Sequence, residues 1–280
     1  MLSPLKDEYI REYAYVPEHL TGYVVAVSKA EPFLFEDYLC YCLRGHLIFI
    51  GYPLRESFEE GKVKKVLNSA IGRFKPDNVA LISPAILTSK ENCYKSASDY
   101  YYKLDLFKLN IHRKLRNTIN HASRELYVEK KQEITNEHIQ LVSEFLSSHE
   151  VDDSTRYILE KIPNYISSTR TAWVFSARDK DKSLIAFDIA DLGAKDYAFY
   201  MFNFMSRKNY VPGASDLLLY EVIKTAKEQG KPYINLGLGI NDGVRFFKRK
   251  WGGVPFLNYE FCFYKRRDKT DKLKILLEKP

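Results

Sequence analysis

The chain has 280 residues, enough for one large domain or for two of about 120 to 150 residues each. Apolar residues make up 45% and charged residues 28%, which is ordinary for a globular protein, and no low-complexity tract argues for disorder. The formal charge of +7 favours an anionic partner such as coenzyme A, RNA, an anionic lipid or a nucleotide-linked substrate, although a basic excess can also serve solubility alone.

No apolar run reaches the roughly 18 to 20 residues that cross a bilayer, and the first residues lack the apolar core of a signal peptide, so we expect a cytoplasmic protein. Four cysteines are present without Cys-x-x-Cys spacing: Cys40, Cys42, Cys93 and Cys262. Since Cys40 and Cys42 would share one face of a strand, we expect all four to be reduced and structural. The sequence predicts no metal site and no tightly bound cofactor.

The first half of the chain predicts strands, a helix and a further strand. Aromatic and β-branched residues indicate a strand from Thr21 to Ala30 and a hairpin from Tyr38 to Pro53 that turns at Arg44-Gly45. A helical apolar stripe runs from Glu60 to Phe74, and a strand follows from Val79.

The second half repeats this order. It predicts strands at 171–177, 183–192 and 197–206, a helix at 216–229 and a strand at 233–238. In both halves a proline-containing turn joins the helix to the following strand, at Lys75-Pro76 and at Gly230-Lys231-Pro232. The order indicates an internal repeat and therefore two similar α/β halves.

The segment between the halves predicts helices. Residues 109–126 read as a strongly basic helix, which places a boundary near residue 128 and divides the chain into domains 1–127 and 128–280. Thr135 or Asn136 can cap the next helix. Asp153 then caps or opens another helix, which we expect to end near Pro163-Asn164.

A basic loop from Arg207 to Ser215 leads into the helix at 216–229, whose apolar face leaves Asp216 and Glu221 elsewhere. Free N–H groups and the dipole at a helix N-terminus favour a phosphate, a carboxylate or a developing oxyanion. The alternative is that Ser215 only caps the helix and Pro212-Gly213 only turns the chain. The candidate donor-binding residues of this region and of the following strand and helix are Lys208, Gly213, Ala214, Ser215, Asn235 and Phe247.

The predicted helix of residues 244–251, capped by Asn241 or Asp242, places Lys248 between an apolar and a basic face. A lysine there could stabilise negative charge on a carbonyl oxygen during acyl transfer, or it could belong to a solvated basic face. Tyr210 and Tyr220 are candidates for assisting proton transfer. The Gly237-x-Gly239 pair is too short for a dinucleotide fingerprint.

The succession of aromatic strand, loop, helix, strand and Arg245-Phe-Phe-Lys-Arg-Lys-Trp-Gly-Gly253 resembles the C-terminal domain of the Fem peptidoglycan-bridge aminoacyltransferases and the catalytic region of phosphatidylglycerol lysyltransferases. Tyr102-Lys-Leu-Asp-Leu106 and Lys114-Leu-Arg-Asn-Thr-Ile-Asn-His-Ala-Ser-Arg124 resemble the segment that joins the two halves of that family. The resemblance implies an α/β (α+β) fold of two tandem GNAT-like domains, each with a mixed, mainly antiparallel sheet flanked by helices. It also implies that Phe247 and Lys248 lie near the reaction centre.

Two features depart from these families. The chain lacks the coiled-coil arm of some bridge-forming members. The loop also matches the GNAT pyrophosphate-binding pattern loosely, because Val211 replaces its first glycine when Lys208 takes the basic position and Gly213 the second glycine.

The expected function is transfer of an acyl or aminoacyl group from acyl-coenzyme A or aminoacyl-tRNA to an amine by direct attack. A tRNA donor needs a broad basic surface, for which the candidates are Arg113, Lys114, Arg116, Arg245 and Arg249. The alternative is a non-catalytic GNAT-like module that binds RNA or another polyanion through the same helices. The absence of a Gly-x-Ser-x-Gly elbow argues against a serine hydrolase.

Overall fold

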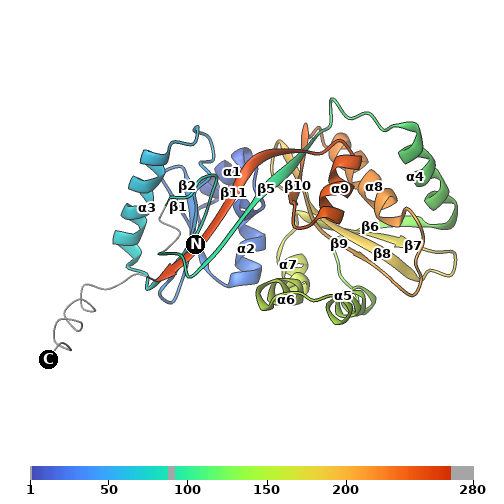
Figure 1. The fold of residues 1–280 in the computed structure, drawn as a ribbon, viewed down its shortest axis with the longest axis horizontal. Helices are drawn as coiled ribbons and strands as arrows, with labels where there is room; N and C mark the ends of the chain where they lie inside the picture. The colour runs from blue at the N-terminus through green and yellow to red at the C-terminus, as the bar shows by residue number, and fades with distance from the viewer. Residues whose placement is uncertain (1, 88–91, 266–280) are drawn as a thin grey trace. The chain divides into compact units, whose positions relative to one another are not determined.

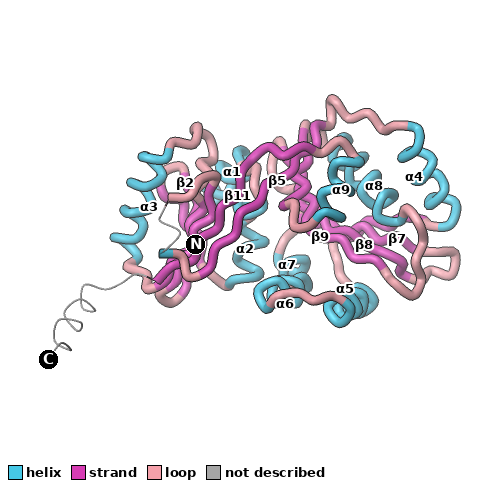
Figure 2. The backbone as a smooth tube through the Cα atoms, in the orientation of Figure 1, coloured by secondary structure: helices cyan, strands magenta, loops and turns pink. Residues whose placement is uncertain are grey.

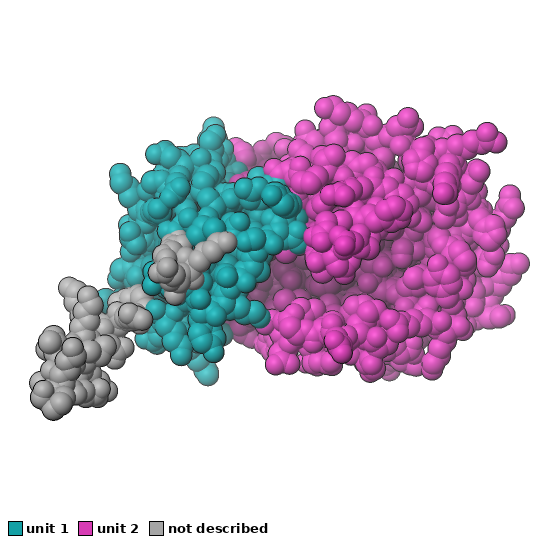
Figure 3. Space-filling view, in the orientation of Figure 1, with its two compact units in different colours: residues 1–6, 30–100, 257–280 teal, residues 7–29, 101–256 magenta. Residues whose placement is uncertain are grey.

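The computed structural model describes residues 2–87 and 92–265. The chain divides into two compact units, which Figure 3 colours separately. Of the described residues, unit 1 takes 2–6, 30–87, 92–100 and 257–265, and unit 2 takes 7–29 and 101–256. Within the described residues, no helix is both long enough and apolar enough to pass through a bilayer.

Unit 1 is built on strands β1 (Glu31–Phe35), β2 (Tyr38–Leu43), β3 (His46–Ile50), β4 (Asn78–Ser83) and most of β11 (Val254–Lys265). Its sheet has β1, β2 and β3 antiparallel in succession, β4 parallel to β3, and β11 antiparallel to β4. Helix α3 (Glu60–Phe74) connects β3 to β4 and buries Val63, Val66 and Ala70 against the sheet. This heptad-like apolar stripe is what makes α3 a covering helix.

Unit 2 has the sheet order β5-β10-β9-β8-β7-β6. Its strands are β5 (Lys95–Asp105), β6 (Tyr127–Lys131), β7 (Ala172–Arg178), β8 (Leu184–Asp191), β9 (Tyr197–Met205) and β10 (Tyr233–Leu238). Strands β6 to β9 are antiparallel in succession, whereas β10 is parallel to β9 and antiparallel to β5.

Helices cover both faces of this sheet (Figure 1, Figure 2). One face carries α4 (Arg113–Glu125), α8 (Ala214–Glu228) and α9 (Asp242–Lys250), with Leu218, Val222 and Trp251 in its core. The other face carries α2 (Thr21–Ser28), α5 (Asn136–Ser148), α6 (Asp153–Glu160) and α7 (Ile162–Ser168). The remaining described helices are α1 (Pro4–Tyr13) and the short 3-10 helix η1 (Pro17–His19).

Both units contain the succession of elements that the sequence predicted for each half. In each, antiparallel strands lead through a covering helix to a parallel strand: β3-α3-β4 in unit 1 and β9-α8-β10 in unit 2. In each, the next strand of the sheet comes from the other half of the chain. Strand β11 pairs with β4, and β5 pairs with β10. The mixed, mainly antiparallel α/β fold expected from the sequence is therefore observed.

The units do not follow the expected boundary near residue 128. Helix α4 packs its buried Leu115, Ile119 and Ala122 into the core beneath α8, so residues 101–127 belong to unit 2. The start of the chain is divided as well, because residues 7–29 also belong to unit 2.

Most predicted elements are confirmed, but the strand predicted from Thr21 to Ala30 is wrong. These residues form α2, whose Val24 and Ala26 are buried and which packs against α7. The β-branched composition indicated a strand, and tertiary packing overrides that preference.

The predicted end of a helix near Pro163-Asn164 is also wrong. Helix α6 ends at Glu160, and Pro163 instead stands in the first turn of α7, where its missing N–H is not needed. The caps at Thr135 and Asn241 and the start at Asp153 are confirmed.

The prediction of four reduced cysteines is wrong for two of them. Cys93 and Cys262 form a disulfide in unit 1, with their Cα atoms 5.4 Å apart across a sequence separation of 169 residues. Antiparallel pairing of β11 with β4 brings Cys262 to this place, and no local spacing could reveal it. Cys40 and Cys42 are free, and burial raises the pKa of the Cys40 thiol to about 12.

Candidate functional site

The parallel strands β9 and β10 pair only at their beginnings. The pairs run from Tyr197 with Tyr233 to Phe199 with Asn235. Beyond that point β9 stays with β8 as far as Met205, while β10 stays with β5 and has a register shift between Asn235 and Leu238. The two strands therefore diverge, and we call the opening between residues 200–205 and 236–238 the fork. In the space-filling view, unit 2 is hollowed where Figure 1 draws β9 (Figure 3).

Lys248 of α9 reaches into the fork. Its side chain is buried, 4% exposed, and its Nζ donates to the carbonyl of Leu238 at the end of β10. Nζ also lies 5.7 Å from the centroid of the Tyr102 ring. The sequence predicted Lys248 at the border between an apolar and a basic face, and the structure places its buried side chain at the point where β10 leaves β9.

Gly237 allows this approach. Its φ of +74° is a conformation that side chains disfavour, and a Cβ built there would lie 3.7 Å from Lys248 Nζ and 3.8 Å from the carbonyl oxygen of Tyr200. One glycine thus separates the ammonium on one side of the fork from the backbone of β9 on the other.

Phe247 packs against β9. Its ring is stacked on that of Tyr200 at 6.5 Å between centroids with an angle of 24°. Asn235, in contrast, is fully buried: its amide donates to the carbonyl of Tyr15 and accepts from the N–H of Gly237, both at 2.8 Å. Asn235 thereby holds the backbone of β10 at its register shift.

The N-terminus of α8 lies next to the fork through Ser215. Its hydroxyl is within 3.2 Å of the Asn203 amide nitrogen on β9. Gly213, at φ +83°, is the N-cap residue, and Ala214 is buried at the first helical position. A helix start of this kind presents N–H groups that have no partner within the helix.

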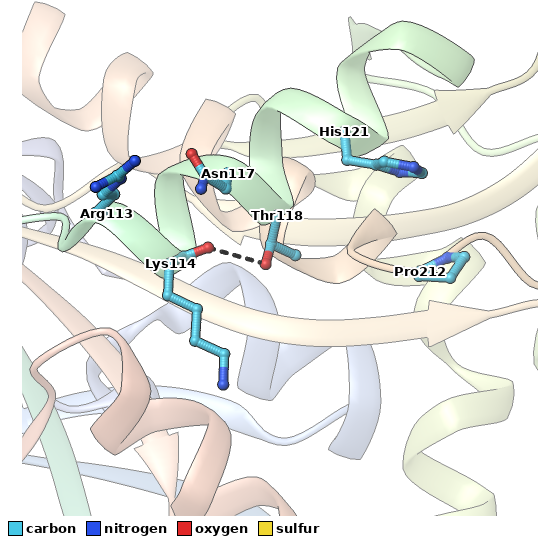
Figure 4. Close-up of a pocket in the computed structure, with 6 residues that line it drawn as sticks. All are labelled: Arg113, Lys114, Asn117, Thr118, His121 and Pro212. Atoms are coloured by element: carbon cyan, nitrogen blue, oxygen red, sulfur yellow. Dashed lines mark hydrogen bonds between the residues drawn. The ribbon is translucent and has the colours of Figure 1, made fainter.

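The loop before α8 packs directly on α4. A Cβ built at Gly213 would lie 2.8 Å from Thr118 Cγ2 and 3.1 Å from the Thr118 carbonyl oxygen. Between this loop and α4 lies an open pocket of about 770 Å³. Figure 4 shows Pro212 of the loop nearest to His121 and the residues of α4 that line the pocket: Arg113, Lys114, Asn117, Thr118 and His121.

The remaining predicted site residues are distributed over the β9–α8 loop, α8, α4 and α9. Lys208 and Tyr210 are exposed in the β9–α8 loop, and Tyr220 is partly buried against the α8 core. Arg116 donates to the carbonyl of Ile111, and Arg245 is paired with Asp242. Arg249 is exposed on α9.

Asp216 was expected away from the apolar face of its helix, and this is wrong. It is 6% exposed and accepts a hydrogen bond from Trp251 Nε1 at 3.0 Å, while Lys250 Nζ lies 2.6 Å from its Oδ1. The carboxylate therefore ties the start of α8 to the end of α9, two elements that flank the fork. Helical spacing alone could not show this, because the partners come from another helix.

Sequence reasoning also missed Asp188 of β8. It is fully buried, accepts from Asn203 Nδ2 at 2.5 Å, and burial raises the pKa of its carboxyl to about 8. An aspartate within the apolar strand Leu184–Asp191 was the available signal, since a buried acid among apolar neighbours is rare without a role.

No protein-family model matches the sequence, and no curated protein is similar to it in sequence. Solved structures are similar in fold. A C-terminal domain of a putative lysylphosphatidylglycerol synthetase from Agrobacterium fabrum matches with a TM-score of 0.61 and 16% identity, over 99% of this chain and 96% of that one. FemX matches with a TM-score of 0.62 and 11% identity, over 100% of this chain and 99% of that one.

This chain has a GNAT-like fold of the Fem and lysylphosphatidylglycerol synthetase type. L-PGS from Bacillus licheniformis has the same fold, with a TM-score of 0.59 and 16% identity over 98% of this chain and 96% of that one. A tandem GNAT protein from the clavulanic acid biosynthesis pathway also matches, with a TM-score of 0.57, 10% identity and 93% coverage of each chain. The resemblance expected from the sequence is thus confirmed at the level of the fold.

Proposed function

We propose that unit 2 transfers an acyl or aminoacyl group to an amine by direct attack, with the reacting carbonyl held in the fork between β9 and β10. The observation that carries this proposal is the buried ammonium of Lys248 at the point where the strands diverge. As the amine attacks, the carbonyl oxygen gains negative charge. A fixed positive charge in a water-poor site stabilises that charge more than it stabilises the neutral ground state.

The donor would lie across the start of α8, with its phosphates towards the pocket beside α4. Arg113 and Lys114 line that pocket, and the N-terminus of α8 adds the positive end of its dipole. Acyl-coenzyme A and aminoacyl-tRNA both place phosphates at a distance from a reactive carbonyl, so both remain candidate donors. FemX and the lysylphosphatidylglycerol synthetases, which share the fold, support the same class of reaction.

The test replaces Lys248 with methionine, which keeps the length of the apolar stem and removes the charge. We expect kcat to fall by about 10² to 10³ with a smaller change in KM, because the charge acts on the transition state. The measurement is coenzyme A release with a panel of amines and, in parallel, consumption of aminoacyl-tRNA.

Lys231 provides a matched control. It is a second buried lysine of unit 2, 6% exposed, whose Nζ donates to the carbonyl of Ala194. Lys231→Met should lower stability as Lys248→Met does and leave kcat at the wild-type level. Equal kcat values for wild type and Lys248→Met would exclude the proposed role of the ammonium.

A second candidate function is binding of RNA or another polyanion without turnover, and the pocket beside α4 favours it. Charge reversal at Arg113 and Lys114 should then weaken tRNA binding and flatten its salt dependence by about one unit of slope per lost phosphate contact. Charge reversal at Lys224 of α8, whose side chain is 57% exposed, is the control. Binding without consumption of any donor would favour this function over transfer.

A further inference from the structure

Three polar side chains of β8 and β9 converge on the side of the sheet that α8 covers. Asp188 lies deepest, at 0% exposed, and its Oδ1 accepts from Asn203 Nδ2 at 2.5 Å. Asn203 is exposed and also contacts the hydroxyl of Ser215 in the first turn of α8. A polar path therefore leads from the surface beside the α8 N-terminus to a buried carboxyl group.

Tyr200 completes this cluster. Its hydroxyl and Asp188 Oδ2 are buried, and among the side chains that the structure describes they are two of three such atoms with no hydrogen-bond partner. Leaving a buried polar atom unpaired destabilises a folded protein. Atoms of this kind in a folded protein call for an explanation, and a substrate group that approaches them is one.

Asp191, which lies on β8 like Asp188, is a buried aspartate whose hydrogen bonds are all made within the protein. It is 1% exposed, yet its oxygens accept from the hydroxyls of Tyr165 and Thr171 and from the N–H of Gly193. The two aspartates are three residues apart and equally buried. Of the two, Asp188 alone has an oxygen without a hydrogen bond of ordinary geometry, and the hydroxyl of Tyr200 lies near enough to lower its pKa.

Among the described residues, the polar and titratable groups that act on Asp188 and Tyr200 come from β8, β9 and α8. Burial is the main cause that raises the pKa of Asp188 to about 8, and the contacts with Asn203 and Tyr200 act in the opposite direction. From α8, Asp216 faces Tyr200, and it is itself held by Lys250 and Trp251 of α9. On β7 the residue opposite Asp188 is the apolar Phe175. A carboxyl group that titrates near neutrality can both take up and release a proton.

The same cluster borders the fork. The ring of Tyr200 stacks on Phe247, the neighbour of Lys248, and its carbonyl oxygen lies 3.8 Å from a Cβ built at Gly237. Tyr200 therefore contacts the buried carboxyl and also Phe247 and Gly237, which border the fork.

We propose that Tyr200 and Asp188 together accept the proton that the attacking amine loses, an inference that rests on the transfer function proposed above. As the C–N bond forms, the amine N–H breaks and its proton passes to the Tyr200 oxygen. The hydroxyl proton of Tyr200 passes at the same time to Asp188 Oδ2. The bond to the leaving group then breaks with its electron pair, and the proton on Asp188 returns through Tyr200 to the leaving group or to water.

In this scheme Tyr200 is the catalytic residue and Asp188 acts through it. Ionised Asp188 is the active form, so kcat should rise with pH and level off above the pKa of about 8. The kinetic test uses the full chain, the donor that wild type consumes, and an acceptor amine whose own pKa lies well below neutrality. With such an amine, the rise of kcat with pH reflects the titration of a group on the protein and not the titration of the amine.

Asp188→Asn and Tyr200→Phe should each lower kcat by about 10² to 10⁴ while the KM for the donor changes little. Asp188→Asn should also abolish the rise of kcat with pH. Asp191→Asn is the matched control, because it removes an equally buried carboxyl that a tyrosine contacts on the same strand. It should keep the wild-type pH profile, even where it lowers stability.

A second readout needs no substrate. In wild type, infrared spectroscopy should show a protonated carboxyl band that disappears with a midpoint near pH 8 and is missing in Asp188→Asn. A midpoint near that of an ordinary aspartate would overturn the proposal. If Asp188→Asn fails to fold, Tyr200→Phe, which loses one oxygen only, carries the kinetic test.

The outcomes separate this inference from the function on which it rests. If wild type consumes no donor, the transfer function fails and the proton-acceptor role fails with it. If wild type is active and both variants keep its kcat and pH profile, the inference alone is overturned and the fork with Lys248 stands.

Discussion

Lys248 and Lys231 are both buried lysines that donate to a backbone carbonyl, yet their surroundings differ. Burial lowers the pKa of Lys231, and its partner belongs to Ala194 in the β8–β9 connection. Lys248 donates to Leu238 at the end of a strand that has just left its neighbour. The ammonium of Lys231 thus holds the β8–β9 connection in place, whereas the ammonium of Lys248 lies at the fork.

His138 of α5 is a residue whose contribution to stability depends on pH. Its Nδ1 accepts from the N–H of Thr135, its Nε2 lies 2.9 Å from Ser176 Oγ, and burial lowers its pKa from 6.5 to about 4. Between these values the unfolded chain binds a proton that the folded chain does not. The free energy of unfolding should therefore fall as pH drops from 6.5 towards 4, by roughly 2–3 kcal/mol.

Urea unfolding at pH 7 and pH 5, followed by far-UV circular dichroism, checks this prediction. His138→Asn offers an acceptor in the place of Nδ1 and does not titrate, so it should lose much of the difference between the two midpoints. His121→Asn, at a side chain that is 63% exposed, should retain it. A wild-type difference that survives in His138→Asn would assign it to other groups.

At the scale of elements, the start of α8 depends on how closely its loop approaches α4. Gly213→Ala would place a methyl group 2.8 Å from Thr118 Cγ2 at a φ of +83°. The left-handed conformation alone costs about 1–2 kcal/mol, and the clash adds to it. We expect the melting temperature of Gly213→Ala to fall by several degrees, at ~2–4 °C per kcal/mol.

Gly230→Ala separates the cost of the left-handed backbone conformation from the cost of the steric clash. Gly230 follows the other end of α8 at φ +70° and has no atom within 4 Å of a built Cβ. Differential scanning calorimetry should show the smaller loss for Gly230→Ala. Equal losses would mean that the loop can move away from α4, and the pocket beside α4 would then lack a fixed wall.

The elements of the repeat could be read from the sequence because their patterns are local. The apolar stripe of Glu60–Phe74 and the caps at Asn241 and Thr135 depend on neighbours a few residues away. α2 could not be read, because its packing against α7 outweighs its strand-like composition. A place for Lys248 near the reaction centre follows from the resemblance and stays a prediction. The cluster of Asp188 and Tyr200 forms where β8, β9 and α8 meet, and the spacing of residues along the sequence does not predict that meeting.

At the scale of the whole molecule, the disulfide joins two segments that lie 169 residues apart in the chain. Cys93 precedes β5 and Cys262 lies on β11, so the bond ties β11 into unit 1. Cys93→Ala should lower the stability of unit 1 by about 2–4 kcal/mol. Cys42→Ala, which removes a free thiol of the same unit, should cost less.

Alkylation of the native and denatured chain, followed by mass spectrometry, checks the pairing directly. Two labels should be added to the denatured, unreduced protein and four after reduction, because Cys40 and Cys42 are free. Four labels without reduction would show that the expectation of reduced cysteines holds in solution.

The exchange of strands between the halves has a consequence for synthesis on the ribosome. When residues 30–83 have emerged, β1 to β4 and α3 can assemble, but the edge of β4 has no neighbour until residues 257–265 arrive. Unit 2 can be complete first, since its last strands lie before residue 257. The N-terminal sheet must wait through about nine to thirty-five seconds of translation at ~5–20 residues per second, with an open edge that other chains could pair with.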